Sequence, residues 1–189
     1  MYEWPSDITK FRLDNGLLVI AIRTSLNIPR VEARQQIRIA IQEVLASLLN
    51  CVTSEIQLSS QAGQAIKLIN PSNDIGLSIS HDPGLSLAAI NMNGPIGVDL
   101  MATESIPELG ELATLATEYL GEKVTGYILN QPVEERKITF AKAWVTFEAS
   151  MKLKGLAINE WSVARDALLK NIKHIELDLA TGYIGAVAY

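Results

Sequence analysis

The chain has 189 residues, of which 48% are hydrophobic and 20% charged, and its formal net charge is −5. This composition is that of a globular protein of one domain or two small halves, and it excludes disordered and collagen-like chains. The single cysteine, Cys51, excludes an internal disulfide and a cysteine-cluster metal site.

The distribution of charge and of apolar runs narrows the class of protein further. The net acidity argues against a general nucleic-acid binder, which normally carries a basic excess. No apolar run approaches the ~18–20 residues of a membrane helix, and the first residues lack the apolar run of a signal peptide. We therefore expect a cytoplasmic protein with no membrane contact.

The first half of the chain is predicted to contain strands and one long helix. Residues 17–22 form a continuous apolar run, which is typical of a buried strand. After Pro29, which can open a helix, apolar residues recur at helical spacing up to about residue 49. Residues 50–75 are expected to be loop-like. Short apolar stretches bounded by Gly, Pro, Asn or Asp then predict three strands, at 75–80, 85–92 and 96–101.

In the second half the predicted helices precede the strands. A helical pattern covers 107–129 and is interrupted near Gly121, and a long helix runs from Pro132 to Gly155. A further helix is possible at 159–169, and the last strands are predicted at 172–179 and 183–189. The predicted fold class is α+β, with two halves of similar plan, 1–101 and 102–189, in a pseudo-two-fold arrangement.

Two carboxylates lie in apolar surroundings, where an unpaired charge is costly. Asp99 interrupts the apolar strand at 96–101, and Glu148 lies in an apolar helix on one face with Trp144 and Lys152, at spacings of four. Two carboxylates suit Mg²⁺, whereas no His/Cys set exists for zinc. The simpler alternatives are that Asp99 is a strand-end turn residue and that Glu148 and Lys152 form an ordinary surface ion pair.

Two further groups of side chains could bind an anion. Ser80 and His81 precede an Asp-Pro-Gly turn, where a hydroxyl, an imidazole and backbone N–H groups can meet a phosphate; a histidine at such a place can equally have no role. Arg30, Arg34 and Arg38, each four apart, line one helix face that is either simply solvated or holds phosphate. Neither a Walker loop nor a Gly-x-Gly-x-x-Gly fingerprint is present.

Taken in their order, these segments resemble the 4′-phosphopantetheinyl transferase family of the surfactin-synthetase type. The resemblance covers residues 29–189 and is closest at 75–101 and 140–156. The segments that carry it are Ile79-Ser80-His81, Ala88-Ala89-Ile90, Gly97-Val98-Asp99, the helix motif Trp144-x-x-x-Glu148-Ala149-x-x-Lys152-x-x-Gly155, and the ending Gly182-Tyr183-Ile184-Gly185-Ala186-Val187-Ala188.

The resemblance implies an enzyme that moves 4′-phosphopantetheine from coenzyme A to a serine of an acyl or peptidyl carrier protein and releases 3′,5′-ADP. It implies two similar α+β halves with the site between them, a plan that permits a monomer. Asp99 and Glu148 would hold Mg²⁺ on the pyrophosphate, Glu148 would also be the general base for the carrier serine, and Lys152 would contact the phosphates.

The resemblance also implies a binding site for the 3′-phosphate of coenzyme A. Ser80 and His81 would bind this phosphate directly. Arg30 and Arg34 resemble the helix cations that the family places near it.

The chain departs from the family pattern at three positions. Met101 stands where many members have a second acid, Phe147 where they have a lysine before the motif glutamate, and Gln64 where a further lysine is usual. A third metal ligand could be Glu118, Glu122 or water. These departures leave open a non-catalytic relative that binds coenzyme A or a carrier protein, and a different α+β protein that matches by chance.

Overall fold

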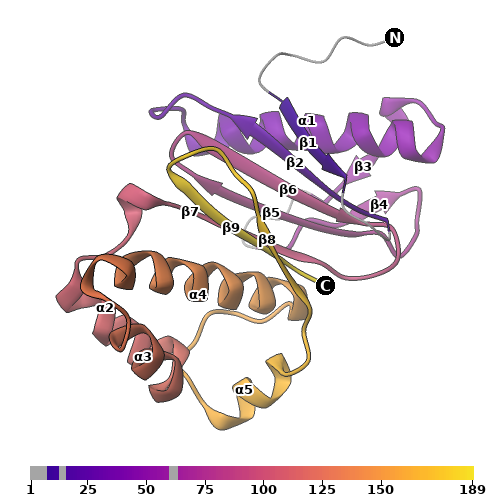
Figure 1. Cartoon of the computed structure of the whole chain (residues 1–189). Helices are drawn as coiled ribbons and strands as arrows, with labels where there is room; N and C mark the ends of the chain where they lie inside the picture. Colours follow the sequence, from indigo (N-terminus) through magenta and orange to yellow (C-terminus); the bar gives the residue numbers. More distant parts are fainter. Residues whose placement is uncertain (1–7, 13–15, 60–63) are drawn as a thin grey trace. The chain divides into compact units, whose positions relative to one another are not determined.

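The computed structural model of the chain describes residues 8–12, 16–59 and 64–189. It divides into two compact units, Met1–Ile96 and Gly97–Tyr189, and each contains helices and an antiparallel sheet (Figure 1). The predicted α+β class is therefore confirmed. None of the helices in these described ranges is long and apolar enough to cross a membrane.

The first unit is built on a four-stranded antiparallel sheet. Its order is β1 (Ile8–Arg12), β2 (Leu17–Arg23), β6 (Leu85–Asn91) and β5 (Gly76–Asp82). Every residue of β6 is buried, as expected for an inner strand of continuous apolar sequence. The strands predicted from residues 17, 75 and 85 onward are therefore confirmed.

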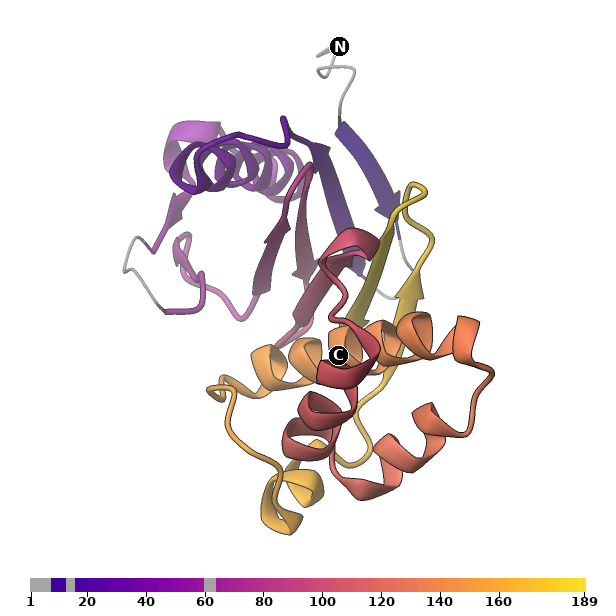
Figure 2. The ribbon, with the colours of Figure 1, turned by 90° about the vertical axis from the view of Figure 1, so that its left-hand side faces the viewer.

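Helix α1 (Arg30–Leu49) covers one face of this sheet (Figure 2). It begins after Pro29, and its buried stripe includes Ile37, Ile41 and Leu45, each fully buried against the apolar side chains of the sheet. The helix predicted after Pro29 is confirmed, and the reason is the apolar stripe at helical spacing.

The segment expected to be a loop contains short elements. These are the 3₁₀ turn η1 (Thr53–Glu55) and the two-stranded sheet of β3 (Gln57–Leu58) and β4 (Leu68–Asn70). Two side chains of α1 donate hydrogen bonds to the backbone of this segment. Gln42 Nε2 donates to Ile56 O at 2.9 Å, and Arg38 Nη2 donates to Leu58 O at 3.2 Å. The prediction of a loop was wrong here, because the segment is held by hydrogen bonds from a helix that is distant in sequence, and local sequence signals do not show such bonds.

The second unit is built on a three-stranded antiparallel sheet in the order β7 (Gly97–Ala102), β9 (Tyr183–Ala188) and β8 (His174–Leu177). The predicted division of the chain lay after residue 101, whereas β7 belongs to this unit because its whole length pairs with β9. Strands β8 and β9 lie within their predicted ranges, and β7 extends one residue beyond its predicted end.

Helix α4 (Val133–Lys154) packs along β7 and β9. The approach to β7 is so close that a Cβ atom on Gly97 would lie 1.9 Å from the Ala149 carbonyl oxygen. Only a glycine fits there, and this contact fixes the strand that carries Asp99 against the helix that carries Glu148 and Lys152.

After the 3₁₀ turn η2 (Thr103–Ser105), further helical segments flank α4. They are α2 (Leu109–Leu115), the π-helical turn η3 (Ala116–Leu120), α3 (Glu122–Leu129) and α5 (Val163–Leu169). The interruption predicted near Gly121 is confirmed: this residue has φ +84°, and the Trp161 indole occupies the place of a side chain. The possible helix at 159–169 begins only at Val163, after the N-cap Ser162, whose hydroxyl accepts from the backbone N–H of Arg165.

We predict that Gly97→Ala lowers the free energy of unfolding by about 2–3 kcal/mol or more, because the new methyl group must push β7 away from α4. Gly126→Ala is the matched control, since nothing lies within 4 Å of a Cβ there and alanine favours the helix by about 0.5–1 kcal/mol. Urea unfolding measures both changes. Equal stability of the two variants would show that the approach at Gly97 is not as close as described.

Candidate functional site

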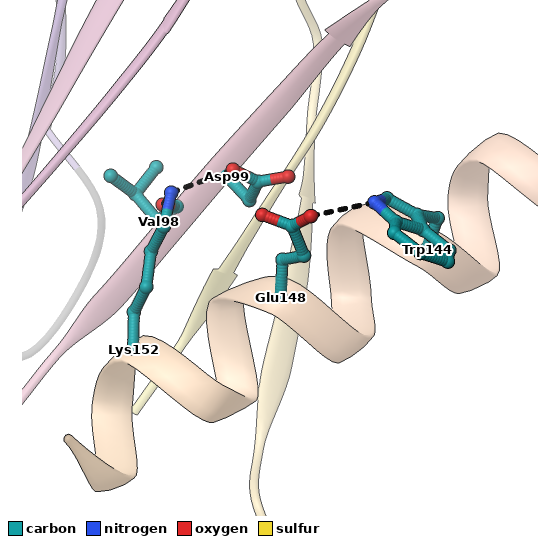
Figure 3. A network of polar contacts seen from close by, with 5 residues as sticks. All are labelled: Val98, Asp99, Trp144, Glu148 and Lys152. Carbon is teal, nitrogen blue, oxygen red and sulfur yellow. Dashed lines mark hydrogen bonds and ion pairs between the residues drawn. The ribbon is translucent and has the colours of Figure 1, made fainter. Parts of the chain in front are cut away.

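The carboxylates predicted from the sequence come together in the second unit. Asp99 lies on β7, and Glu148 lies on the face of α4 that is turned to it, so that the two carboxylates point toward one another (Figure 3). Lys152, one turn further along α4, reaches the same place. The structure therefore joins residues that are about 50 positions apart in the sequence.

Asp99 is a buried charge, with 5% of the residue exposed. Lys152 Nζ lies 2.7 Å from Asp99 Oδ1 and also donates to the Val98 carbonyl oxygen at 3.0 Å. Asp99 is thus an interior residue of a strand with a cationic partner, and not a turn residue at its end. The ammonium group of Lys152 offsets part of the cost of burying this carboxylate.

Glu148 is held by Trp144, one turn earlier on the same helix. The indole Nε1–H donates to Glu148 Oε1 at 2.7 Å. The indole itself lies among other rings, with its centroid 5.7 Å from that of Tyr119, 5.5 Å from Phe140 and 6.1 Å from Phe147. This aromatic cluster restricts the rotamer of Trp144 and so fixes the direction of the Glu148 carboxylate.

The surroundings raise the pKa of Glu148 above its ordinary value. The largest cause is burial, and the negative charge of Asp99 acts in the same direction. Lys152 and the indole N–H of Trp144 lower the pKa but do not compensate. Glu148 is thus a carboxylate that takes up a proton more readily than a solvated one, which is what a general base needs.

The donor set of this site fits a hard divalent cation. Asp99 and Glu148 supply carboxylate oxygens from two different elements, and these are the ligands that Mg²⁺ prefers. One lysine faces two carboxylates, so a cation there would relieve the remaining negative charge. Within the described residues, no group of three or more Asp, Glu, His or Cys side chains is placed to hold a metal. Glu118 and Glu122, considered from the sequence as third ligands, are both exposed.

The residues predicted to bind a phosphate lie in the first unit. Ser80 is buried on β5, and His81 follows it with Nδ1 2.7 Å from Ser86 Oγ on β6. His81 therefore lies within a strand and not in a loop, and it is cross-strand from Ser86. Arg30 and Arg34 are exposed in the first turns of α1.

Two departures from the family pattern are core residues here. Phe147 is 9% exposed and packs in the helical core of the second unit, with the Arg165 guanidinium 4.7 Å from its ring centroid. Met101 packs against the same core. Both positions are therefore apolar for a packing reason.

Cys51 and His174 have structural roles. Cys51 packs against the core of the first unit. Ser150 Oγ donates to Thr146 O at 2.7 Å, so its contact of 2.7 Å with His174 Nε2 is one in which the imidazole donates.

Searches of the sequence against models of known protein families and against curated proteins gave no match. The function of this chain is therefore inferred from the geometry of the site and from the motifs that occupy it.

The hydrogen bond from Trp144 was not predicted. Its signal was present in the sequence, because the spacing of four placed Trp144 and Glu148 on one helix face. Spacing alone does not show that an indole N–H points at a carboxylate. That direction depends on the rings of Tyr119, Phe140 and Phe147 around it.

We predict that Trp144→Phe raises the pKa of Glu148 further, because the carboxylate loses a donor that favours its charged form. The measurement is a pH titration of the side-chain carboxyl carbon by NMR. Tyr119→Phe is the control, since it keeps the ring beside Trp144 and leaves the indole N–H in place. An unchanged Glu148 pKa in Trp144→Phe would contradict the role assigned to this bond.

We also predict that Glu148 makes the protein less stable as the pH rises. The pKa of Glu148 is higher in the folded chain than its ordinary value of 4.5. Between pH 4.5 and the raised pKa, the folded state therefore binds more protons than the unfolded state does. Stability that is fully present at lower pH is therefore lost across that window. Urea unfolding at stepped pH should show the stability of Glu148→Gln rising relative to the unmodified chain through the window. The exposed control Glu111→Gln should show no such trend, and a flat difference for Glu148→Gln would contradict the prediction.

Proposed function

We propose that this protein transfers 4′-phosphopantetheine from coenzyme A to a serine of an acyl or peptidyl carrier protein, with Mg²⁺. The observation that carries the proposal is the facing pair Asp99 and Glu148, with Lys152 bound to the buried acid at 2.7 Å. These three residues occupy the positions at which the resembling family has its metal ligands, base and phosphate-binding lysine.

The reaction in question is a phosphoryl-group transfer. The serine Oγ of the carrier bonds to the β-phosphorus of the pyrophosphate of coenzyme A, and the bond from that phosphorus to the bridging oxygen breaks. The products are the phosphopantetheinyl serine and 3′,5′-ADP, and the serine proton must go to a base. Such a reaction needs positioning and charge stabilisation more than covalent help from the protein.

The residues of the second unit are suited to these tasks. Asp99 and Glu148 would hold Mg²⁺, which when bound neutralises charge on the pyrophosphate. Glu148, with its raised pKa, accepts the serine proton, and its carboxylate is oriented by Trp144. Lys152 is anchored between Asp99 and the Val98 carbonyl group, from where its ammonium contributes positive charge to the phosphates.

The first unit is proposed to bind the remote end of coenzyme A. The Ser80 hydroxyl and the His81 imidazole contact the 3′-phosphate, and the exposed guanidinium groups of Arg30 and Arg34 add positive charge. The similar plan of the two halves is part of the same proposal: in each unit a long helix, α1 or α4, packs on an antiparallel sheet.

One observation favours a second candidate, a non-catalytic relative that binds coenzyme A or a carrier protein. Phe147 fills core space beneath Arg165 where the family has a lysine, so this chain lacks one cation next to Glu148. Binding without transfer would be the result if that missing cation were essential.

We predict a mass gain of one phosphopantetheine group on a carrier protein incubated with this protein, coenzyme A and Mg²⁺, and its loss with EDTA. Intact-mass spectrometry of several apo carrier proteins measures it. Glu148→Gln should slow the transfer by about 10²–10⁴-fold, the usual effect of losing a general base. Lys152→Met should also slow it, whereas Lys154→Met, an exposed lysine on the same last turn of α4, should not.

The outcomes separate the two candidates. No mass gain on any carrier, with coenzyme A still raising the melting temperature, would favour the non-catalytic relative. Neither a mass gain nor a thermal shift would remove both. Normal turnover by Glu148→Gln would remove this residue from the mechanism while leaving the activity itself established.

A further inference from the structure

A hollow of the C-terminal unit lies beside the aromatic cluster that surrounds Trp144. It has a volume of about 780 Å³, and its walls come from η3, the helices α3, α4 and α5, and β8 (Figure 1 labels these helices and β8). From α4 it takes Lys142 and Thr146, which are two residues away from Trp144 and Glu148. Residues two apart do not share a helix face, so Lys142 and Thr146 point away from the face of Glu148. Tyr119 and Phe147 line the pocket and also contact Trp144.

The walls of the pocket are rich in aromatic rings: Tyr119, Tyr127, Phe147 and Trp161 all line it. Tyr127 is 62% exposed and Trp161 is 40% exposed, so a ligand can reach both rings. Trp161 is nevertheless fixed, because its backbone N–H donates to Glu118 O at 2.6 Å and its indole rests on Gly121, which has no side chain. The ring therefore forms a prepared wall of the pocket.

The polar side chains of the pocket carry an excess of negative charge. Both of its cations are engaged: Lys142 Nζ lies 2.8 Å from Glu176 Oε2, and the Arg165 guanidinium donates to backbone carbonyl groups and covers Phe147. Of the other lining carboxylates, Asp166 lies close enough to Arg165 to act on its charge, whereas Glu134 and Glu135 have no ion pair with any described residue.

Two further carboxylates, Glu118 and Glu160, act on Tyr119 of this wall without lining the pocket. The pKa of the Tyr119 phenol is raised, first by the negative charge of Glu118 and then by burial, by a hydrogen bond with Glu118 and by the charge of Glu160. The field at this wall therefore disfavours a further negative charge.

We propose that this pocket binds an organic cation, an ammonium ion carried on an apolar or aromatic body. The exposed rings of Tyr127 and Trp161 supply apolar contact area and faces that attract a cation, and the carboxylates of Glu134 and Glu135 supply the opposite charge. The volume is that of a site for a small molecule. The same charge repels the phosphates of coenzyme A, so the ligand proposed for this pocket differs in charge from that of the proposed transfer site.

Three probes with the same phenylbutyl body test the proposal: 4-phenylbutylamine as the cation, 4-phenylbutan-1-ol as the neutral analogue and 4-phenylbutyrate as the anion. Binding is followed by isothermal titration at pH 7, where the amine is protonated. We expect the amine to bind at least about tenfold more tightly than the alcohol and the carboxylate more weakly than both. NMR signals of the Ile138 and Leu169 methyl groups, which line the pocket, should shift with the amine.

Variants locate the charge that is recognised. The double variant Glu134→Gln, Glu135→Gln changes two exposed residues of the first turn of α4, and it should weaken the amine at least about tenfold while leaving the alcohol unchanged. Glu104→Gln, Glu111→Gln is the matched control, since these exposed acids of the same unit lie outside the pocket lining. Trp161→Ala should weaken the amine and the alcohol alike.

The result is independent of the proposed transfer. Glu148→Gln, on the other face of α4, should bind the amine as the unmodified chain does, whether or not the protein modifies a carrier. Equal affinity for the amine and the alcohol, or tighter binding of the carboxylate, would overturn the proposed ligand class. No binding of any probe up to about 10 mM would overturn the site itself.

Discussion

A buried carboxylate on a strand constrains the whole second unit. Asp99 is almost fully enclosed where β7 meets α4, and a charge in such a place must have partners. Lys152 supplies one from the last turns of α4, and it can do so because Gly97 lets the helix approach the strand at van der Waals distance. The position of α4 along β7 is therefore tied to one ion pair and one missing side chain, and Glu148 is placed by the same contact.

The electrostatics of the site follow from that placement. Two carboxylates face each other, one ammonium group is bound to Asp99, and the indole of Trp144 adds a neutral donor to Glu148. Burial and the charge of Asp99 raise the pKa of Glu148 by more than Lys152 and Trp144 lower it, so the net shift is upward. An arrangement of this kind can be completed by a cation and can take up a proton, and both are useful for transfer between phosphate and hydroxyl oxygens.

Helix α4 presents two chemically different faces. One carries Trp144, Glu148 and Lys152 toward β7, whereas the other carries Lys142 and Thr146 into an aromatic, acidic pocket. Phe147 lies between them in the core, beneath the Arg165 guanidinium. A lysine at position 147 would have to leave the core, so the phenylalanine there is tied to the packing of α5.

The sequence by itself determined the order and type of nearly all elements, because their signals are local. The apolar stripe after Pro29, the start at Pro132 and the interruption at Gly121 depend on neighbouring residues only. The sequence also indicated Asp99, Glu148 and Lys152 as chemistry-bearing residues. Only the tertiary structure decided that Lys152 reaches Asp99, 53 positions away, because helix spacing shows which side chains share a face but not which strand residue that face meets. The short strands at 57–58 and 68–70 and the aromatic pocket were decided in the same way, by contacts between segments that are distant in the chain.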